Sequence, residues 1–273
     1  MLLNAIRSFT SEILAQLTER QRNQIYKLFE RIIPGKREVL AHKHLKGSGI
    51  EIGAMHNPLP VPRGVSVQYI DYLQPEQNYQ RFKEIRNHQL VRPHIVEDGF
   101  ILPSFEKCSV DFLIANHVLE HSDNALKTII RWAEVIRPNG ILFLSVPICD
   151  RCFDKGRVIT TVDHFKSDFE LERSGDTKNF RDQTRKHYSE WLSISLPAIL
   201  ASQESDFDQA NFENSLKTAD ELLSENLEIH FHTFTSVSFE ELLNYFCANV
   251  SHNFRLIEIV ENGIEVIGIL EKK

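Results

Sequence analysis

The sequence predicts an α/β protein whose core is a mostly parallel β-sheet. Between residues 47 and 147, short apolar strands alternate with helical stretches, as expected of parallel strands that are buried on both faces. The C-terminal residues behave differently, because two alternating strands flank Glu261-Asn262-Gly263. Such a turn is typical of a hairpin, so we expect the sheet to end in an antiparallel pair.

The individual elements follow from their apolar patterns and from the breakers between them. The expected parallel strands lie at residues 49–54, 65–73, 93–99, 110–116 and 140–147, and an amphipathic helix spans 128–136. We expect residues 117–121 to turn the fourth strand into a helix, and residues 230–234 to be strand-like with His230 and His232 on one side.

Three regions are expected along the chain. Residues 1–45 form an N-terminal helical extension, whose apolar stripe would pack on the main domain, in a homodimer or, less favourably, on a membrane surface. Residues 46–273 form the α/β domain. Within it, residues 148–253 form a large insertion after the fifth strand, and we expect this insertion to cover the carboxyl end of the sheet, where open α/β sheets bind ligands.

Composition excludes several classes of function. The net charge of −7 argues against a nucleic-acid partner, which would need a basic face. No apolar run is long enough to span a bilayer, and the N-terminus lacks the pattern of a signal peptide, so we expect a cytoplasmic protein. Cys149 and Cys152 form a C-x-x-C pair, but without further ligands or a redox context they are expected to be incidental reduced thiols.

Acidic residues stand at the ends of three successive strands. Glu51 precedes a single turn glycine, Gly53, while Asp71 ends the second strand about twenty residues later. Glu97-Asp98 ends the third strand. Carboxylates in these positions can accept hydrogen bonds from the ribose hydroxyls and the adenine amino group of an adenosine. The ordered set therefore predicts a nucleoside site at the carboxyl end of the sheet.

At this point the chain resembles the class I S-adenosylmethionine-dependent methyltransferases. The similarity rests on the order GIEIGA, YID, VEDG, VDFLIANHVLEH and EVIRPNGILFLSVP, and it is closer to a bacterial branch of small methyltransferases in which His-Asn-Pro follows the first glycine. The resemblance implies a Rossmann-like, seven-stranded sheet and S-adenosylmethionine as cofactor, with S-adenosylhomocysteine as product. It implies the cofactor contacts Glu51, Gly53, Ala54, Met55, Asp71, Asp98, Asn116 and His117.

The loop GAMHNPLP departs from the usual glycine-rich turn of that superfamily. Asparagine tolerates a left-handed backbone better than other non-glycine residues, so we expect Asn57 to replace a missing glycine and Pro58 to stiffen the exit.

Histidines supply the candidates for chemistry. A hydroxyl acceptor must lose a proton as it attacks the methyl group, and a histidine with a near-neutral pKa is the natural base. We predict His121 or His164 in this role, because each follows a strand that ends near the expected methyl group. The predicted acceptor-binding residues are His187, Tyr188, Trp191, His230 and His232.

A divalent metal is a less favoured possibility. Residues 117–121 match the H-x-x-E-H pattern of one class of zinc protease, but that pattern requires a helix, and here it follows a buried strand. Some metal-dependent O-methyltransferases carry a similar segment, so a metal, if present, would be held by His117, Glu120, His121 and His164.

The favoured function is methyl transfer to a hydroxyl of a small molecule or glycan. The alternative is a non-catalytic subunit that binds S-adenosylmethionine within a biosynthetic complex. A dinucleotide oxidoreductase would need a fuller glycine motif.

Overall fold

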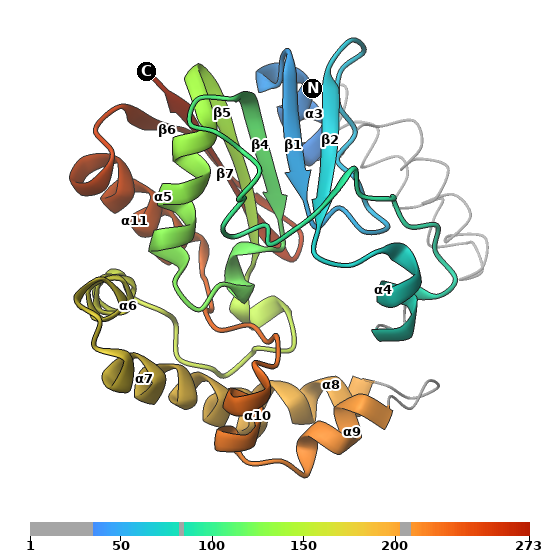
Figure 1. The fold of residues 1–273 in the computed structure, drawn as a ribbon, viewed down its shortest axis with the longest axis vertical. Coiled ribbons are helices and arrows are strands. Elements are labelled where there is room, and N and C mark those ends of the chain that lie inside the picture. The colour runs from blue at the N-terminus through green and yellow to red at the C-terminus, as the bar shows by residue number, and fades with distance from the viewer. Residues whose placement is uncertain (1–34, 82–84, 203–208) are drawn as a thin grey trace, which may run out of the picture.

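The computed structural model describes residues 35–81, 85–202 and 209–273 (Figure 1). The predicted N-terminal helix before residue 32 and the homodimer contact through it lie outside the described residues. Within the described ranges, no helix is both long and apolar enough to cross a membrane.

A seven-stranded sheet with the order β3-β2-β1-β4-β5-β7-β6 forms the centre of the molecule. The strands are β1 (Ser48–Ile52), β2 (Ser66–Asp71), β3 (Ile95–Val96), β4 (Val110–Asn116), β5 (Ile136–Pro147), β6 (Phe254–Asn262) and β7 (Glu265–Lys272). Strands β1 to β5 pair in parallel, whereas β7 runs antiparallel to both β5 and β6. The predicted mostly parallel sheet with an antiparallel C-terminal pair is confirmed, although β3 is only two residues long.

The central strands are apolar on both sides because each side of the sheet is covered. On one side, helices α5 (Ala125–Val135) and α11 (Ser236–Tyr245) lie side by side across the strands (Figure 1). Trp132 of α5 and Phe239 of α11 are fully buried there. On the other side, Leu40 and Ala41 of α3 (Lys36–His44) pack in a separate core with β4, β5 and β7.

Close approach of β1 to β4 depends on one glycine. A Cβ atom placed on Gly49 would lie 2.4 Å from the Phe112 carbonyl oxygen of β4. A side chain therefore does not fit at this position without moving the strands apart, which positions the end of β1 beside the end of β4.

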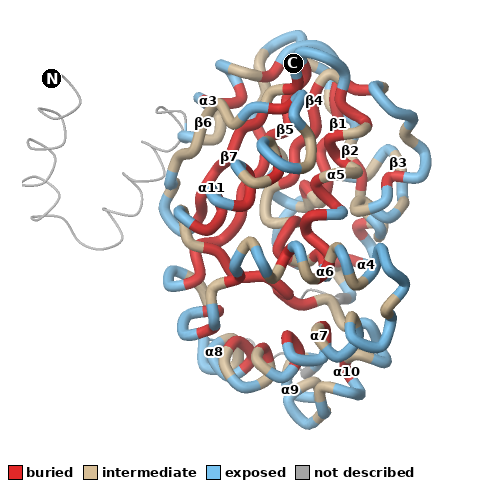
Figure 2. Tube along the Cα trace, turned by 90° about the vertical axis from the view of Figure 1, so that its left-hand side faces the viewer, coloured by how far each residue is buried: buried red, intermediate tan, exposed pale blue. Residues whose placement is uncertain are grey.

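The insertion is mainly helical and lies beyond the carboxyl end of the sheet (Figure 1). Its helices are α6 (Val162–Ser174), α7 (Thr177–Glu190), α8 (Leu196–Ser202), α9 (Gln209–Ser215) and α10 (Ala219–Glu225), with a π-helical turn, η4 (Trp191–Ser195), between α7 and α8. Buried segments are concentrated in the sheet, while α7, η4, α8 and α10 bury a smaller core of their own (Figure 2).

The remaining short elements connect these layers. They are α4 (Pro75–Arg81), η2 (Leu119–His121), η3 (Cys149–Arg151) and η5 (Phe246–Val250). Although α11 falls inside the predicted insertion at 148–253, its Phe239 and Leu243 pack directly on Gly268 of β7. Helix α11 is therefore part of the layer that covers the sheet.

Three local predictions were wrong. Residues 117–121 do not form a helix, because His117 has a left-handed backbone with φ of 56° and only the 3-10 turn η2 follows. Residues 230–234 form no regular strand, and only Phe234 makes a bridge, to Ile148. In the loop after β1, Gly53 and Met55 take the left-handed conformation, with φ of 65° and 45°, and Asn57 does not.

Candidate functional site

Glu51 is a buried acidic side chain at the carboxyl end of the sheet. It is only 1% exposed at the end of β1. The backbone N–H of Leu59 donates to both of its carboxylate oxygens, at 2.9 and 3.2 Å, which closes the loop after β1 over the strand end. Burial raises the pKa of Glu51 to about 7, although the Leu59 hydrogen bond opposes the shift.

The turn after Glu51 leaves room for a ligand to lie close to the backbone. Gly53 donates its backbone N–H to the Ile70 carbonyl of β2 at 2.9 Å. A Cβ atom at Gly53 would lie 3.1 Å from the Val118 side chain, so glycine keeps this space open. Ala54 is small and nearly buried, and Met55 follows it in a left-handed conformation.

Asp71 and Asp98 stand at the ends of the two neighbouring strands. Asp71 accepts from the backbone N–H of Leu73 at 3.1 Å, and burial raises its pKa. Asp98 accepts from the backbone N–H of Phe100 at 2.8 Å. Each carboxylate retains acceptor positions for a ligand, because a carboxylate has about four lone-pair sites. The strand order therefore brings together three predicted cofactor contacts, Glu51, Asp71 and Asp98.

Asn116 and His117 extend this edge to the end of β4. Asn116 accepts from the Ser145 hydroxyl of β5 at 3.0 Å, and its amide nitrogen is buried without a partner among the described residues. The His117 Nε2 lies 3.0 Å from a carboxylate oxygen of Glu265 on β7. Arg37 of α3 donates to the same carboxylate at 2.7 Å. Burial alone would raise the pKa of Glu265, but the hydrogen bonds from His117 and Arg37 hold it well below its usual range.

The turn η2 places Glu120 and His121 against the returning segment 229–235. The backbone N–H of Phe231 donates to the Glu120 carbonyl at 2.8 Å. The His121 and His230 rings meet edge to face with centroids 4.7 Å apart. Ligand atoms of Glu120, His121 and His230 lie within 4.8 Å of one another, so this group could hold a metal ion. We call it the η2 cluster.

Protonation within the η2 cluster follows from the partners of each ring. The His121 Nδ1 lies 3.1 Å from the Ile229 carbonyl, which only accepts, so Nδ1 carries the proton and Nε2 is left as a base or ligand. Burial lowers the pKa of His121 well below its usual value, and the neighbouring His230 lowers it further. His121 is therefore neutral at pH 7.

Asp154 orients His230 through a buried network. The His230 Nδ1 donates to one Asp154 oxygen at 2.6 Å, while Ser195 and Arg157 donate to the other at 2.7 and 2.9 Å. Burial alone would raise the pKa of Asp154, but these partners hold it well below the usual range. Because Nδ1 of His230 donates to Asp154, the proton is on Nδ1 and Nε2 keeps its lone pair.

The Glu120 carboxylate lacks hydrogen-bond donors among the described residues. The residue is fully buried, and neither oxygen has a hydrogen-bond partner in the described part of the chain. The Nδ1 of His117 lies 3.7 Å from Oε1 of Glu120. Burial raises the pKa of Glu120. A buried carboxylate without partners is costly, so a ligand or a proton is expected there.

The predicted metal quartet is not one site. His164 lies apart from the η2 cluster, in a second group with Asp168, His187 and His232. His230 and His232 are therefore divided between two clusters, because the irregular backbone at 230–234 does not hold them on one side as a strand would.

Two predicted acceptor-binding residues are core residues of the insertion. Tyr188 and Trp191 are 1% and 5% exposed and pack with Leu196, Leu222 and Ile229. The Tyr188 hydroxyl donates to the Leu227 carbonyl at 2.8 Å. Their burial stabilises the helical insertion, and it leaves no surface of either side chain for an acceptor.

The C-x-x-C pair shows no reactive thiol. Both cysteines are free, and the Cys149 thiol donates to the Asp154 carbonyl at 3.1 Å. Burial raises the pKa of Cys149 and raises that of Cys152 to about 12. Low-pKa thiolates are needed for redox chemistry, so the pair is structural.

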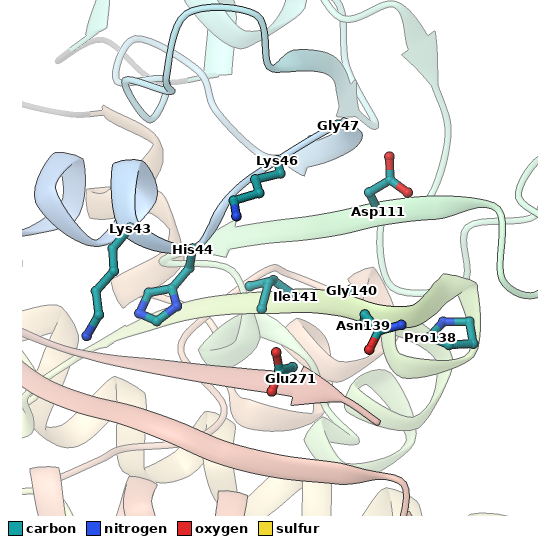
Figure 3. Close-up of a pocket in the computed structure, with 10 residues that line it drawn as sticks. All are labelled: Lys43, His44, Lys46, Gly47, Asp111, Pro138, Asn139, Gly140, Ile141 and Glu271. Atoms are coloured by element: carbon teal, nitrogen blue, oxygen red, sulfur yellow. The ribbon is translucent and has the colours of Figure 1, made fainter.

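A surface pocket lies at the opposite, amino end of the strands (Figure 3). Its lining residues are Lys43, His44, Lys46, Gly47, Asp111, Pro138, Asn139, Gly140, Ile141 and Glu271. None of them belongs to the acidic strand ends or to either histidine cluster. Ligands of open α/β sheets bind at the carboxyl ends, so we place the candidate site there and not in this pocket.

Sequence reasoning missed Asp154, Asp168 and Glu265. Asp168 follows His164 by four residues, so the spacing of an i, i+4 pair could have indicated it. No sequence signal relates Asp154 to His230 or Glu265 to His117, because those contacts join residues 76 and 148 positions apart.

The residues at the strand ends fit S-adenosylmethionine. Its ammonium and ribose hydroxyls are donors, which suit the carboxylates of Glu51 and Asp71. Its carboxylate is an acceptor, which suits the unpartnered amide nitrogen of Asn116. The space kept open at Gly53 is where a ligand can approach the backbone.

Residues 47–144 match a family model described as a methyltransferase domain. No curated protein gives a significant match.

Three solved structures illustrate the likeness of the fold. A structure from Rhodobacter sphaeroides, described as a zinc-dependent alcohol dehydrogenase, has a TM-score of 0.49 and 14% identity, with 88% of this chain and 91% of that chain covered. A SAM-dependent methyltransferase from Aquifex aeolicus has a TM-score of 0.42 and 12% identity, covering 91% and 96%. One from Methanosarcina mazei has a TM-score of 0.43 and 17% identity, covering 86% and 96%.

The matched segment contains β1 to β4 and most of β5, with the acidic ends of β1, β2 and β3. Residues 47–144 therefore match a methyltransferase domain, which agrees with S-adenosylmethionine as the cofactor.

Proposed function

We propose that the protein transfers a methyl group from S-adenosylmethionine to a hydroxyl of a small molecule or glycan, with His121 as the general base. One observation carries the proposal. His121 stands in the turn directly after β4, and β4 is the neighbour of β1, whose end holds Glu51. The proton acceptor and the predicted cofactor residues thus share the carboxyl edge of the sheet.

His121 is suited to accept a proton. Its Nδ1–H is fixed on the Ile229 carbonyl, which leaves Nε2 with a lone pair. The lowered pKa keeps the ring neutral before the reaction. His164 is the weaker candidate, because its Nε2 already lies 3.0 Å from His187 Nε2 and 3.3 Å from Asp168.

The other residues of the proposed site would bind the cofactor and orient it. When bound, S-adenosylmethionine supplies an electrophilic methyl group and its own leaving group. Glu51, Asp71 and Asp98 would hold its polar groups, and Gly53 lets it approach the backbone. Most of the catalytic effect of such a site comes from alignment of the reactants and exclusion of water.

The insertion supplies a cover for the acceptor. The Tyr72 hydroxyl, just after β2, donates to Glu228 of the returning segment at 2.6 Å. That contact joins the insertion to the cofactor edge and supports an acceptor site enclosed between them. A small, neutral hydroxyl compound suits a chain with net charge −7 better than a polyanion does.

The η2 cluster also allows a metal-assisted form of the same reaction. Two imidazoles and a carboxylate could hold a divalent cation, which would lower the pKa of an acceptor hydroxyl. The buried oxygens of Glu120 favour this form. In it, His121 would be a ligand and not a base.

Calorimetric titration with S-adenosylmethionine and S-adenosylhomocysteine tests cofactor binding, and methyl transfer into a panel of sugars and phenols tests turnover. Binding without turnover on any acceptor would favour the non-catalytic subunit. His121→Ala should lower turnover about 10²–10⁴-fold with little change in cofactor affinity. His252→Ala, which alters an exposed histidine before β6, is the control. Unchanged turnover in His121→Ala would remove His121 from the reaction.

Treatment with a chelator separates the two forms of the proposal. Activity that survives chelation supports His121 as a base. Activity that is lost and then restored by Mg²⁺ or Zn²⁺, and that is absent in Glu120→Gln, supports the metal-assisted form.

A further inference from the structure

A second cluster of potential ligands lies within the insertion. Helix α6 supplies His164 and Asp168, which are four residues apart and so share one helix face. Helix α7 supplies His187, and the returning segment supplies His232. One ligand atom of each residue lies within 4.8 Å of the other three. We call this group the α6–α7 cluster.

Three of the four side chains are buried, and His164 is partly exposed. The hydrogen bonds within the cluster do not satisfy all of its polar atoms. His232 is fully buried, and Asp168 and His187 are 2% and 8% exposed. The His164 Nε2 lies 3.0 Å from Nε2 of His187 and 3.3 Å from Oδ2 of Asp168. Both nitrogens of His232 and the Oδ2 of Asp168 make no hydrogen bond of good geometry in the described part of the chain, although Oδ2 lies 3.3 Å from His164 Nε2. Burying three such atoms is costly unless something binds them.

The ligand atoms are spaced as around one small cation. His164 Nε2 lies 3.3 Å from Asp168 Oδ2, and His232 Nε2 lies 3.9 Å from the same oxygen. In a tetrahedral site with bonds of about 2.0–2.1 Å, ligand atoms lie roughly 3.3–3.4 Å apart. The observed spacings bracket that value, so small side-chain rotations would complete the geometry.

The surroundings orient the ligands. The Gln183 side-chain amide donates to Oδ1 of Asp168, which directs Oδ2 toward the histidines. The Phe165 ring packs on His232 with centroids 4.8 Å apart. Supporting contacts of this kind are typical of metal sites, where they fix the orientation of each ligand.

We propose that His164, Asp168, His187 and His232 bind a zinc ion that ties α6, α7 and the segment 229–235 together. Three imidazole nitrogens and one carboxylate oxygen suit Zn²⁺, and four protein ligands leave no open position, which is typical of a structural site. The site is independent of the proposed function, because it shares no residue with the η2 cluster or with the cofactor edge.

The site would anchor the insertion to the sheet. Phe165, next to His164, and Phe234, two residues after His232, both belong to the main core, with ring centroids 5.8 Å apart. His187 lies on α7 next to Tyr188, which belongs to the separate core of the insertion. Zinc therefore couples the two cores, and its loss should loosen α6 and α7 before the sheet.

The test measures zinc in the full chain after chelation, incubation with ZnCl₂ and gel filtration. The expected result is that Asp168→Asn and His232→Gln each hold about one zinc ion per chain less than the wild type. Asp163→Asn, the same change at an exposed position of α6, should retain the wild-type content. Glu120→Gln reports separately on any ion in the η2 cluster. Equal zinc in the wild type, Asp168→Asn and His232→Gln would overturn the proposal.

Two measurements keep the test valid if those variants do not fold. Gln183→Ala leaves all four ligands in place and should weaken zinc affinity roughly 10–100-fold. X-ray absorption of the zinc-loaded wild type should show nitrogen and oxygen neighbours only. Sulfur neighbours, or a wild type that takes up no zinc, would refute the site. Calorimetric binding of S-adenosylmethionine is read independently, so a failed zinc site and a failed methyltransferase are distinguishable.

Discussion

Replacing Glu51 with glutamine should raise the free energy of unfolding above that of the wild type at pH 8. At pH 5 the increase should be smaller. Glu51 is 1% exposed, and burial raises its pKa from 4.5 to about 7. Glutamine has nearly the same shape, and its carbonyl oxygen can still accept the Leu59 N–H. The substitution therefore removes the ionisation while retaining most of the packing.

The sign follows from proton linkage. Below pH 4.5 the carboxyl is protonated in both the folded and unfolded states, so it has no effect on stability. Between pH 4.5 and 7 the unfolded chain ionises first, because the folded state binds the proton more tightly, and the free energy of unfolding falls. Above pH 7 the penalty is constant. A shift from 4.5 to about 7 corresponds to a ceiling of about 3 kcal/mol.

Urea unfolding at several pH values measures the effect. The difference in unfolding free energy between Glu51→Gln and wild type should increase by about 2–3 kcal/mol from pH 5 to pH 8. Glu106→Gln, at an exposed loop position, is the matched control and should show no such change. A difference for Glu51→Gln that does not vary with pH would refute the reasoning. The same variant should bind S-adenosylmethionine more weakly, since a charged acceptor for its ammonium is lost.

Three further predictions concern other parts of the fold. Asp71→Asn should weaken S-adenosylmethionine binding by about 1–3 kcal/mol in calorimetry, because a charge-assisted hydrogen bond is lost, and an unchanged affinity would exclude Asp71 from the site. Gly49→Ala should destabilise the protein by about 1–3 kcal/mol or more, since its Cβ meets the Phe112 carbonyl, whereas Gly35→Ala, with open space around it, should not. Cys152, with a pKa near 12, should resist alkylation at pH 8 in peptide mapping while exposed Cys108 reacts, and equal labelling would contradict this.

Local sequence patterns were sufficient to predict the strands of the sheet. The apolar strands, their acidic ends and the Glu261-Asn262-Gly263 turn all act within a few residues, so they could be predicted without tertiary information. The order of Glu51, Asp71 and Asp98 along one edge also followed, because consecutive parallel strands end at the same side.

Local patterns failed where the backbone is irregular. Nothing in HFHTF indicated that His230 and His232 would be divided between two clusters, because alternation predicts direction only for a regular strand. Likewise, the polar tip of Tyr188 suggested an acceptor contact, yet the packing of α7 against α10 buries it.

By itself, therefore, the sequence determined the class of the fold and the edge of the sheet at which the cofactor is expected. Only the tertiary structure decided which histidines meet. It paired His230 with Asp154 across 76 positions and brought His232 to α6 and α7. The physical reason is that strand direction is a local property, whereas the grouping of buried polar side chains depends on how distant segments pack.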